Sequence, residues 1–266
     1  MKRKKYSYAQ IILDIRDAIR LIPEFTLKKI ETRKYGKETY DLRYITQKKP
    51  FPRRPRVMLM GTLHGEEPAG AVALSTHIAE IMQVSLTNKV NLTVIPCGNP
   101  YGLDRNIRNA PGSRYMNGGF CHPNLVPLPE GSAKIKKFLL KTHATHYLDL
   151  HEDKDSRGVY VYAFKDRRIA KKLLSVSTRH LPIEIKPKMD DRDIRNADIK
   201  DGVVFDAHDG TTEDLLSHQK ECIFSGALET PSRHVPMNQR ARAQADAAIE
   251  LIYIAAKAEN QNKNTI

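Results

Sequence analysis

The chain has 266 residues, of which 40% are hydrophobic and 28% are charged. This length allows one large α/β domain with a substantial core, and the composition excludes global disorder. No apolar run is long enough to cross a bilayer, so we expect no membrane partner. Residues 1–5 resemble the basic start of a signal peptide, but Asp14, Arg16, Asp17 and Arg20 interrupt the apolar stretch that should follow. We therefore expect a cytoplasmic protein.

The net charge of +13 is concentrated near the amino terminus. Residues 1–56 hold 17 Lys and Arg against 6 Asp and Glu, whereas the remaining residues hold 27 against 25. Such a segment can bind nucleic acid, or it can be a solvated face that keeps the protein soluble. We favour the solvated face and expect no nucleic-acid partner. The cysteines Cys97, Cys121 and Cys222 have no paired spacing, which predicts reduced thiols.

Hydrophobic periodicity predicts a helix over Ser7–Arg20, ended by Pro23. Two alternating stretches, Phe25–Thr32 and Thr39–Thr46, predict strands of a hairpin. After a proline-rich connector, short apolar runs alternate with helical stretches. The expected elements are Val57–Leu63, Ala69–Val84, Val90–Pro96, Ser132–Lys141, Thr145–Leu150, Val159–Phe164, Asp166–Arg179, Ile183–Ile185, Ile223–Leu228 and Met237–Ala258.

This alternation predicts a three-layer α/β/α fold around a central, mixed, mostly parallel twisted sheet. We expect residues 1–266 to form a single catalytic domain, with the basic helix and hairpin of residues 1–56 as part of it. In such sheets, ligands bind beyond the carboxyl ends of the strands.

Acidic and imidazole side chains follow three of the apolar runs directly. His64 and Glu67 come after the first run, His151 after another, and Glu229 after Ile223–Leu228. If these strands are neighbours, the side chains meet at one edge of the sheet. The spacing H-x-x-E at a turn into a helix lets an imidazole and a carboxylate reach one zinc ion, and His151 is the best third ligand. Glu229 is then placed to act as a general base.

A long polar segment after Val90–Pro96 carries Arg105, Arg108 and Arg114. Long loops in compact domains are often functional, and an arginine can stabilise an oxyanion. A solvated basic loop is the alternative interpretation.

Four motifs together resemble the carboxypeptidase A-like zinc metallopeptidase superfamily, which includes the succinylglutamate desuccinylase/aspartoacylase branch. The motifs are Gly61-x-x-His64-Gly65-x-Glu67, Asn99-Pro100-x-Gly102, Asp149-x-His151 and Leu228-Glu229-Thr230-Pro231. Their order agrees with that of the superfamily, and the resemblance spans roughly residues 7–258.

The resemblance implies one Zn²⁺ per chain, held by His64, Glu67 and His151. It also implies that Glu229 is the general base and acid, and that Arg108 polarises the scissile carbonyl. The expected fold is that of the zinc carboxypeptidases.

Asp-x-Asn-Arg, which binds substrate in the superfamily, corresponds here to Tyr115-Met116-Asn117-Gly118. Asn117 is kept, but Gly118 replaces the arginine that binds the substrate's terminal carboxylate. Arg114 or Arg105 is the candidate to replace it. The segment Asp201–Asp214, which should carry a substrate-contacting tyrosine, holds His208 and no tyrosine.

Chain length bears on the substrate. Desuccinylase-like members add a β-rich domain after the catalytic glutamate, whereas only 37 residues follow Glu229 here. We therefore expect a metallocarboxypeptidase-like peptidase acting on a small peptide. The alternatives are a deacylase of N-acyl amino acids and a weakly active or inactive binding module on the same scaffold. The sequence does not give the oligomeric state.

Overall fold

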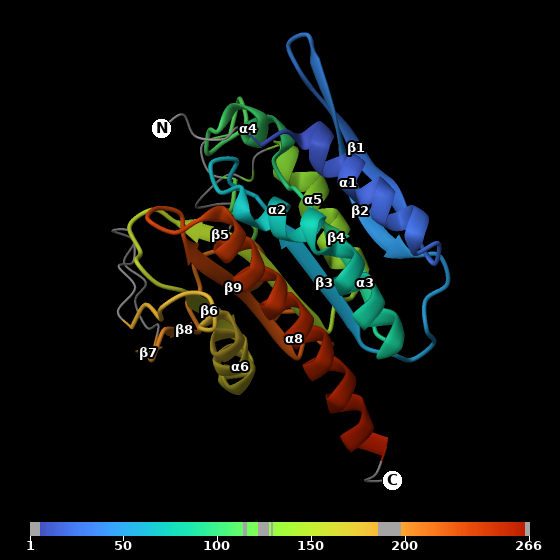
Figure 1. Ribbon diagram of the computed structural model, residues 1–266, viewed down its shortest axis with the longest axis vertical. Helices are drawn as coiled ribbons and strands as arrows, with labels where there is room; N and C mark the ends of the chain where they lie inside the picture. The colour runs from blue at the N-terminus through green and yellow to red at the C-terminus, as the bar shows by residue number, and fades with distance from the viewer. Residues whose placement is uncertain (1–5, 114–115, 122–127, 129, 186–197, 264–266) are drawn as a thin grey trace.

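A nine-stranded sheet forms the centre of the protein in the computed structural model (Figure 1). In the order in which they lie side by side, the strands are β1 (Phe25–Tyr35), β2 (Glu38–Gln47), β4 (Asn91–Ile95), β3 (Arg56–Gly61), β5 (His146–Asp153), β9 (Phe224–Pro231), β6 (Tyr160–Phe164), β8 (Val203–Phe205) and β7 (Asp198–Lys200).

The helices cover both faces of this sheet. They are α1 (Tyr8–Leu21), α2 (Ala69–Thr76), α3 (Ile78–Thr87), α4 (Pro100–Arg105), α5 (Glu130–Thr142), α6 (Arg167–Ser177), α7 (Thr212–Ser217) and α8 (Met237–Lys263). The structure describes residues 6–113, 116–121, 128, 130–185 and 198–263. None of the helices in these ranges is long and apolar enough to span a membrane.

Parallel pairing is concentrated in the middle of the sheet, where β4, β3, β5 and β9 run side by side. The β6–β8 pair is parallel as well, so four of the eight strand pairings among the described residues are parallel. The mixed sheet is confirmed, but it is less parallel than expected. The β1–β2 hairpin extends it antiparallel on one side, and β6 runs against β9 on the other.

Alternate residues of the central strands serve the two layers of the core. Val57 and Leu59 of β3 pack in the cluster that includes α1, α2, α3, α6 and α8, whereas Met58 and Met60 pack in the cluster that includes α5 and α7. Because successive side chains of a strand point to opposite faces, a strand covered on both sides must be apolar throughout. The three-layer α/β/α fold is thus confirmed.

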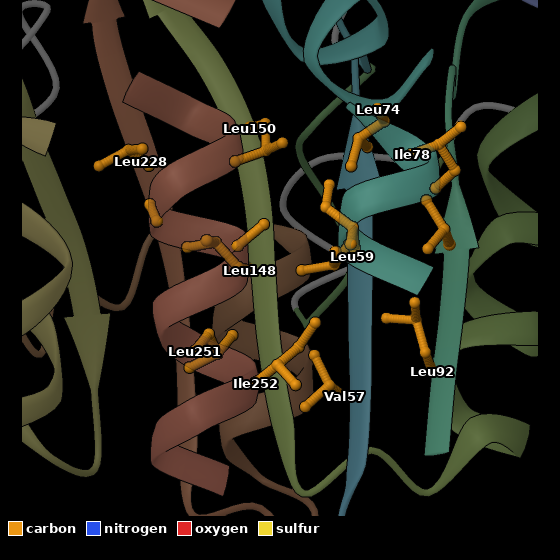
Figure 2. Packing of buried hydrophobic residues seen from close by; sticks show 14 of the residues in the cluster. Val57, Leu59, Leu74, Ile78, Leu92, Leu148, Leu150, Leu228, Leu251 and Ile252 are labelled. Atoms are coloured by element: carbon orange, nitrogen blue, oxygen red, sulfur yellow. The ribbon is translucent and has the colours of Figure 1, made fainter. Parts of the chain in front are cut away.

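The α8 helix covers the middle of the sheet. Figure 2 shows Leu251 and Ile252 of α8 over the sheet near Val57 of β3 and Leu148 of β5. All four side chains are fully buried. Complete burial of such a side chain contributes about 1.5–3 kcal/mol. This packing fixes β5, and therefore the residues at its carboxyl end.

The structure adds β7, β8 and α7 to the predicted elements, and three of the expected elements differ. The single helix expected over residues 69–84 is two helices, which break at His77 (φ −107°, ψ 11°), and no described contact explains the break. The loop expected after β4 begins with α4, whose N-cap Asn99 accepts a hydrogen bond from the Gly102 amide at 3.0 Å. The strand expected over Ile183–Ile185 is one isolated bridge to Val159.

His146, at the start of β5, is fully buried, and its Nε2 has no hydrogen-bond partner within the described part of the chain. Burial lowers the pKa of its imidazole to about 4, from an ordinary value of 6.5. The unfolded chain therefore binds more protons than the folded chain between these values, and stability is lost as the pH falls from about 6.5 towards 4.

We predict that His146→Leu removes this acid-dependent loss, which should amount to about 3 kcal/mol in the wild-type chain. Urea unfolding of both proteins at several pH values between 7.5 and 4 measures the difference. Parallel stability curves for the two proteins would contradict the prediction.

Candidate active site

Three neighbouring parallel strands end at one edge of the sheet. Gly61 of β3 pairs with Leu150 of β5, and Leu150 pairs with Leu228 of β9. One residue further on, His151 lies directly beside Glu229. The strand order and register therefore confirm the prediction that these strand ends lie at one edge of the sheet.

A tight turn after β3 carries His64 and Glu67. Thr62 has a positive φ of 50°, which turns the chain away from the sheet. Its hydroxyl donates to the carbonyl of Glu67 and accepts from the amide of Ala71, both at 2.9 Å. The Glu67 amide donates to the His64 carbonyl at 3.1 Å. These bonds fix the turn, so both side chains face the end of β5.

The Glu67 carboxylate lies between two imidazoles. Its Oε1 is 2.8 Å from Nδ1 of His64, and its Oε2 is 2.8 Å from Nδ1 of His151. Oε2 also accepts the amide of Glu152 at 3.2 Å. The side chains of His64, Glu67 and His151 are 10%, 6% and 3% exposed. One ligand atom from each lies within 4.8 Å of the others, a spacing that a single metal ion can bridge.

The charges of this group are strongly coupled. Burial would raise the pKa of Glu67, but the attraction of His64 and the hydrogen bond from His151 outweigh it and hold that pKa below its ordinary range. Burial lowers the pKa of His64. Burial would also lower the pKa of His151, but Asp149 and Glu67 raise it well above its usual value. The site therefore favours positive charge between its carboxylates.

The Asp149 carboxylate contacts Nε2 of His151, the ring nitrogen that faces away from Glu67. Its Oδ2 is 3.1 Å from Nε2 of His151 and accepts the Thr212 hydroxyl at 3.0 Å. The Thr212 amide donates to Asn117 Oδ1 at 3.1 Å, and Asn117 Nδ2 is 3.5 Å from His151 Nε2. A carboxylate on the outer nitrogen fixes the tautomer and orientation of a ligating histidine. We did not predict this role for Asp149, although the Asp149-x-His151 spacing contains it.

Arg108 reaches the same group from the loop after α4. Its Nη1 donates to Oε1 of Glu67 at 2.9 Å and lies 3.4 Å from Oε1 of Glu66. The Arg108 carbonyl accepts the Asn99 side chain and the Gly65 amide, both at 3.1 Å. The Asn99 and Gly65 motifs thus position the arginine next to the candidate metal ligands.

A cavity of about 270 Å³ opens over these residues. Glu229 lines this cavity. Burial raises the pKa of its carboxyl group well above the usual value. The charge of Glu67 and Asp153 raises this pKa further, whereas His151 lowers it. The charged side chains that line the cavity are Glu66, Glu67, Glu152, Asp153, Asp155, Asp209, Glu213 and Glu229 on the acidic side and Arg108, Lys154 and Arg233 on the basic side.

The predicted substrate-binding residues lie in different places. Asn117 lines the cavity. Arg105 packs on the ring of Tyr101 at 3.9 Å and pairs with Glu38, so it lines a neighbouring hollow and not this cavity. Arg114, and Tyr115 with it, lie outside the described residues.

Sequence reasoning missed several residues of the cavity wall. Arg233 and Lys154 follow the carboxyl ends of β9 and β5, so the rule that located Glu229 and His151 could have found them. Tyr160 and Tyr162 contribute two phenol rings from β6. Glu213 comes from the short α7 helix, which has no clear periodic pattern.

Residues 53–195, more than half of the chain, match the family described as the succinylglutamate desuccinylase/aspartoacylase catalytic domain. The chain belongs to this family. The matched region of this desuccinylase/aspartoacylase member includes His64, Glu67, Arg108, Asn117 and His151. The family is one of hydrolases, as expected, and no curated protein matches the chain.

Solved structures with the same fold extend the comparison over nearly the whole length of this desuccinylase/aspartoacylase family member. A candidate metallopeptidase of Shewanella baltica OS155 has a TM-score of 0.78 and 22% identity, and covers 93% of this chain and 92% of its own. A metallo-carboxypeptidase of Burkholderia cenocepacia has a TM-score of 0.67 and 14% identity, with coverage of 95% and 70%. A metallo-carboxypeptidase of Pseudomonas aeruginosa, in complex with (2-guanidinoethylmercapto)succinic acid, has a TM-score of 0.67 and 13% identity, with coverage of 94% and 69%. The carboxypeptidase-like fold is thus confirmed.

Gly65, next to His64, allows the closest backbone contact of the site. A Cβ at this position would lie 2.1 Å from the Gly102 carbonyl carbon and 2.5 Å from the Ile107 oxygen. We predict that Gly65→Ala forces the His64 turn away from α4, lowers stability by about 1–3 kcal/mol and weakens binding of a divalent ion such as Zn²⁺ between His64, Glu67 and His151. Thermal unfolding and zinc titration measure the two effects.

Gly36→Ala is the matched control. Gly36 has a φ of 61°, so alanine is strained there, but a Cβ would meet no atom within 4 Å. This control should lose stability and keep wild-type zinc affinity. Equal zinc affinity in Gly65→Ala and the wild-type chain would show that the contact does not position His64.

Proposed function

We propose that the protein is a zinc-dependent hydrolase of the carboxypeptidase type that cleaves an amide bond in a small peptide. The observation that carries this proposal is the buried group of His64, Glu67 and His151 on the wall of a cavity that Glu229 shares. We further propose that residues 1–266 act as one catalytic domain, because the β1–β2 hairpin and the site strands belong to one sheet.

The side chains at the site fit zinc. Zinc prefers imidazole nitrogen and carboxylate oxygen, and a catalytic zinc commonly has three protein ligands and one open position. A divalent cation would also offset the excess of buried carboxylates, and Asp149 Oδ1 has no hydrogen-bond partner among the described residues. His64, Glu67 and His151 would hold the ion. When bound, zinc acidifies water and polarises a carbonyl group.

Glu229 would take the proton from the attacking water and return it to the leaving amine. It lies beside His151 in the strand register, so its carboxylate borders the metal group. Burial raises the proton affinity of the Glu229 carboxylate, as a general base requires. Arg108, on the other side of Glu67, would orient the substrate carbonyl and stabilise the developing oxyanion. Asn117 would bind the substrate from the wall near His151.

Arg233 is our candidate for the carboxylate-binding role that Gly118 cannot serve. It follows Glu229 by four residues and lines the same cavity. A guanidinium can bind a carboxylate through two parallel hydrogen bonds, which a lysine such as Lys154 cannot form.

Deacylation of an N-acyl amino acid is the second candidate function, and the match to the desuccinylase/aspartoacylase family favours it. The fit to a candidate metallopeptidase over nine-tenths of both chains favours the peptidase. Both reactions hydrolyse an amide and use the same metal group and general base. In both, the leaving amine belongs to an amino acid with a free carboxylate. They differ in the acyl side of the scissile bond, which is a peptide in one reaction and a small acid such as succinate or acetate in the other.

Mass-spectrometric cleavage assays of the zinc-loaded protein separate the two functions. The substrates are peptides with free or amidated carboxyl ends, and N-succinyl and N-acetyl amino acids. We expect loss of single residues from free carboxyl ends only. Release of acyl groups alone would establish the deacylase, and no turnover by a fully metallated sample would mean that the protein is a binding module.

We predict that Glu229→Gln lowers kcat by about 10²–10⁴-fold, because the amide cannot accept the proton. Zinc content should stay at the wild-type value, since Glu229 is not a proposed ligand. Asp155→Asn, at an exposed position on the same cavity, is the control and should keep wild-type kcat. Near-normal turnover in Glu229→Gln would show that another group carries the proton.

We predict that Arg233→Ala raises KM for a peptide with a free carboxyl end by at least about 10-fold, with a smaller change in kcat, because the lost contact is a charge-assisted one. The inhibition constant of the matched amidated peptide, which we do not expect to be cleaved, should change much less. Steady-state kinetics on the matched peptide pair measure the effect, with Arg105→Ala as the control. If the loss followed Arg105→Ala instead, the carboxylate would bind in the neighbouring hollow.

A further inference from the structure

A second cluster of possible metal ligands lies outside the candidate active site. Cys121, Asp214 and His218 each offer one ligand atom, and these atoms lie within 4.8 Å of one another. Cys121 is half-buried, with its thiol beside the Asp214 side chain. None of the three residues lines the catalytic cavity.

Asp214, in the first turn of α7, is the centre of the cluster. Its side chain is fully buried, and its Oδ2 accepts the amide of Gly210 at 3.0 Å. Its Oδ1 lies 3.3 Å from Nε2 of His218 and 2.8 Å from Nδ1 of His208. One oxygen is thus held by the backbone, while the other faces two imidazoles.

His208 holds the outer side of the cluster. Its ring stacks on that of His218, with the ring centroids 5.8 Å apart and an angle of 25°. The His208 ring also packs against Phe164. Nε2 of His208 lies 3.3 Å from Oδ1 of Asp206. A ligating carboxylate is commonly oriented by such a hydrogen-bond donor. The side chains of His208 and His218 are 47% and 59% exposed, so an ion can enter from solvent.

We propose that Cys121, Asp214 and His218 form a second metal site, which binds a divalent transition ion of the zinc class with His208 orienting the carboxylate. A thiolate and an imidazole select zinc, cobalt or nickel over magnesium or calcium, whose ligands are oxygens. Three protein ligands leave one position for water.

The bound ion would join two segments that form a wall of the catalytic cavity. The segment before Cys121 is held by the hydrogen bond from the Phe120 amide to the Gly210 carbonyl at 2.8 Å, and its Asn117 is bonded to the Thr212 amide. Glu213, beside Asp214, lines the catalytic cavity. An ion at the second site therefore stabilises that wall without contacting substrate.

Cobalt titration of the metal-free, reduced full-length protein tests this proposal. The ligands proposed for the catalytic ion include no thiolate, so a thiolate-to-cobalt charge-transfer absorption reports the second site alone. We expect this absorption to reach saturation at one thiolate-bound cobalt per chain. It should persist in His64→Ala, which removes a ligand of the other site.

Variants assign the absorption to its ligands. Cys121→Ser should abolish it, whereas Cys222→Ser, at another free cysteine, should keep it. His218→Ala removes a proposed ligand and should weaken cobalt binding at this site at least 10-fold. His208→Ala removes the residue that orients the carboxylate and should weaken it about 10–100-fold. Both variants change exposed side chains. No charge-transfer absorption in the wild-type chain at saturating cobalt, or full absorption in Cys121→Ser, would overturn the proposal.

Discussion

The Glu67 carboxylate, buried between the imidazoles of His64 and His151, is the interaction on which the rest of the site depends. A buried carboxylate without partners is very unfavourable, because the protein interior cannot replace its hydration. Here both oxygens are occupied: two imidazoles, the Arg108 guanidinium and the Glu152 amide all point at them. The same arrangement that stabilises this charge brings together the donors that a zinc ion requires.

Each local feature around Glu67 serves that convergence. The parallel register of β3, β5 and β9 places the ends of three strands side by side, so residues far apart in the sequence meet without long connections. The close contact of Gly65 with Gly102 joins the His64 turn to α4, and Asn99 joins α4 to the Arg108 loop. Apolar packing under α8 holds the strands in place, so the polar groups at their ends have little freedom (Figure 2).

The sequence predicted the parts of this site that depend on strand ends and short motifs. His64, Glu67, His151 and Glu229 follow apolar runs, and parallel strands bring their ends to one edge whatever the details of packing. The polar segment that carries Arg108 also makes Arg105 a candidate to bind the substrate's carboxylate, yet the Arg105 side chain stacks on Tyr101 and pairs with the hairpin residue Glu38. No local pattern specifies such a long-range pairing.

Residues held by tertiary contacts were the hardest to predict. The role of Asp149 depends on Thr212 in α7 and on Asn117, two segments whose positions only the fold determines. Likewise, Asp214 and His218 become neighbours of Cys121 only when α7 packs beside residues 116–121. In the fold itself, the antiparallel outer strands made the sheet less parallel than alternation of strands and helices indicated.

Anomalous diffraction at the zinc edge, from crystals of the zinc-loaded protein, locates the ion itself. We expect a zinc peak about 2.0–2.2 Å from a ring nitrogen of both His64 and His151 and from an oxygen of Glu67. Absence of a peak between these three side chains in a zinc-loaded crystal would contradict this expectation. In that case Glu67 would serve only to pair two buried histidines.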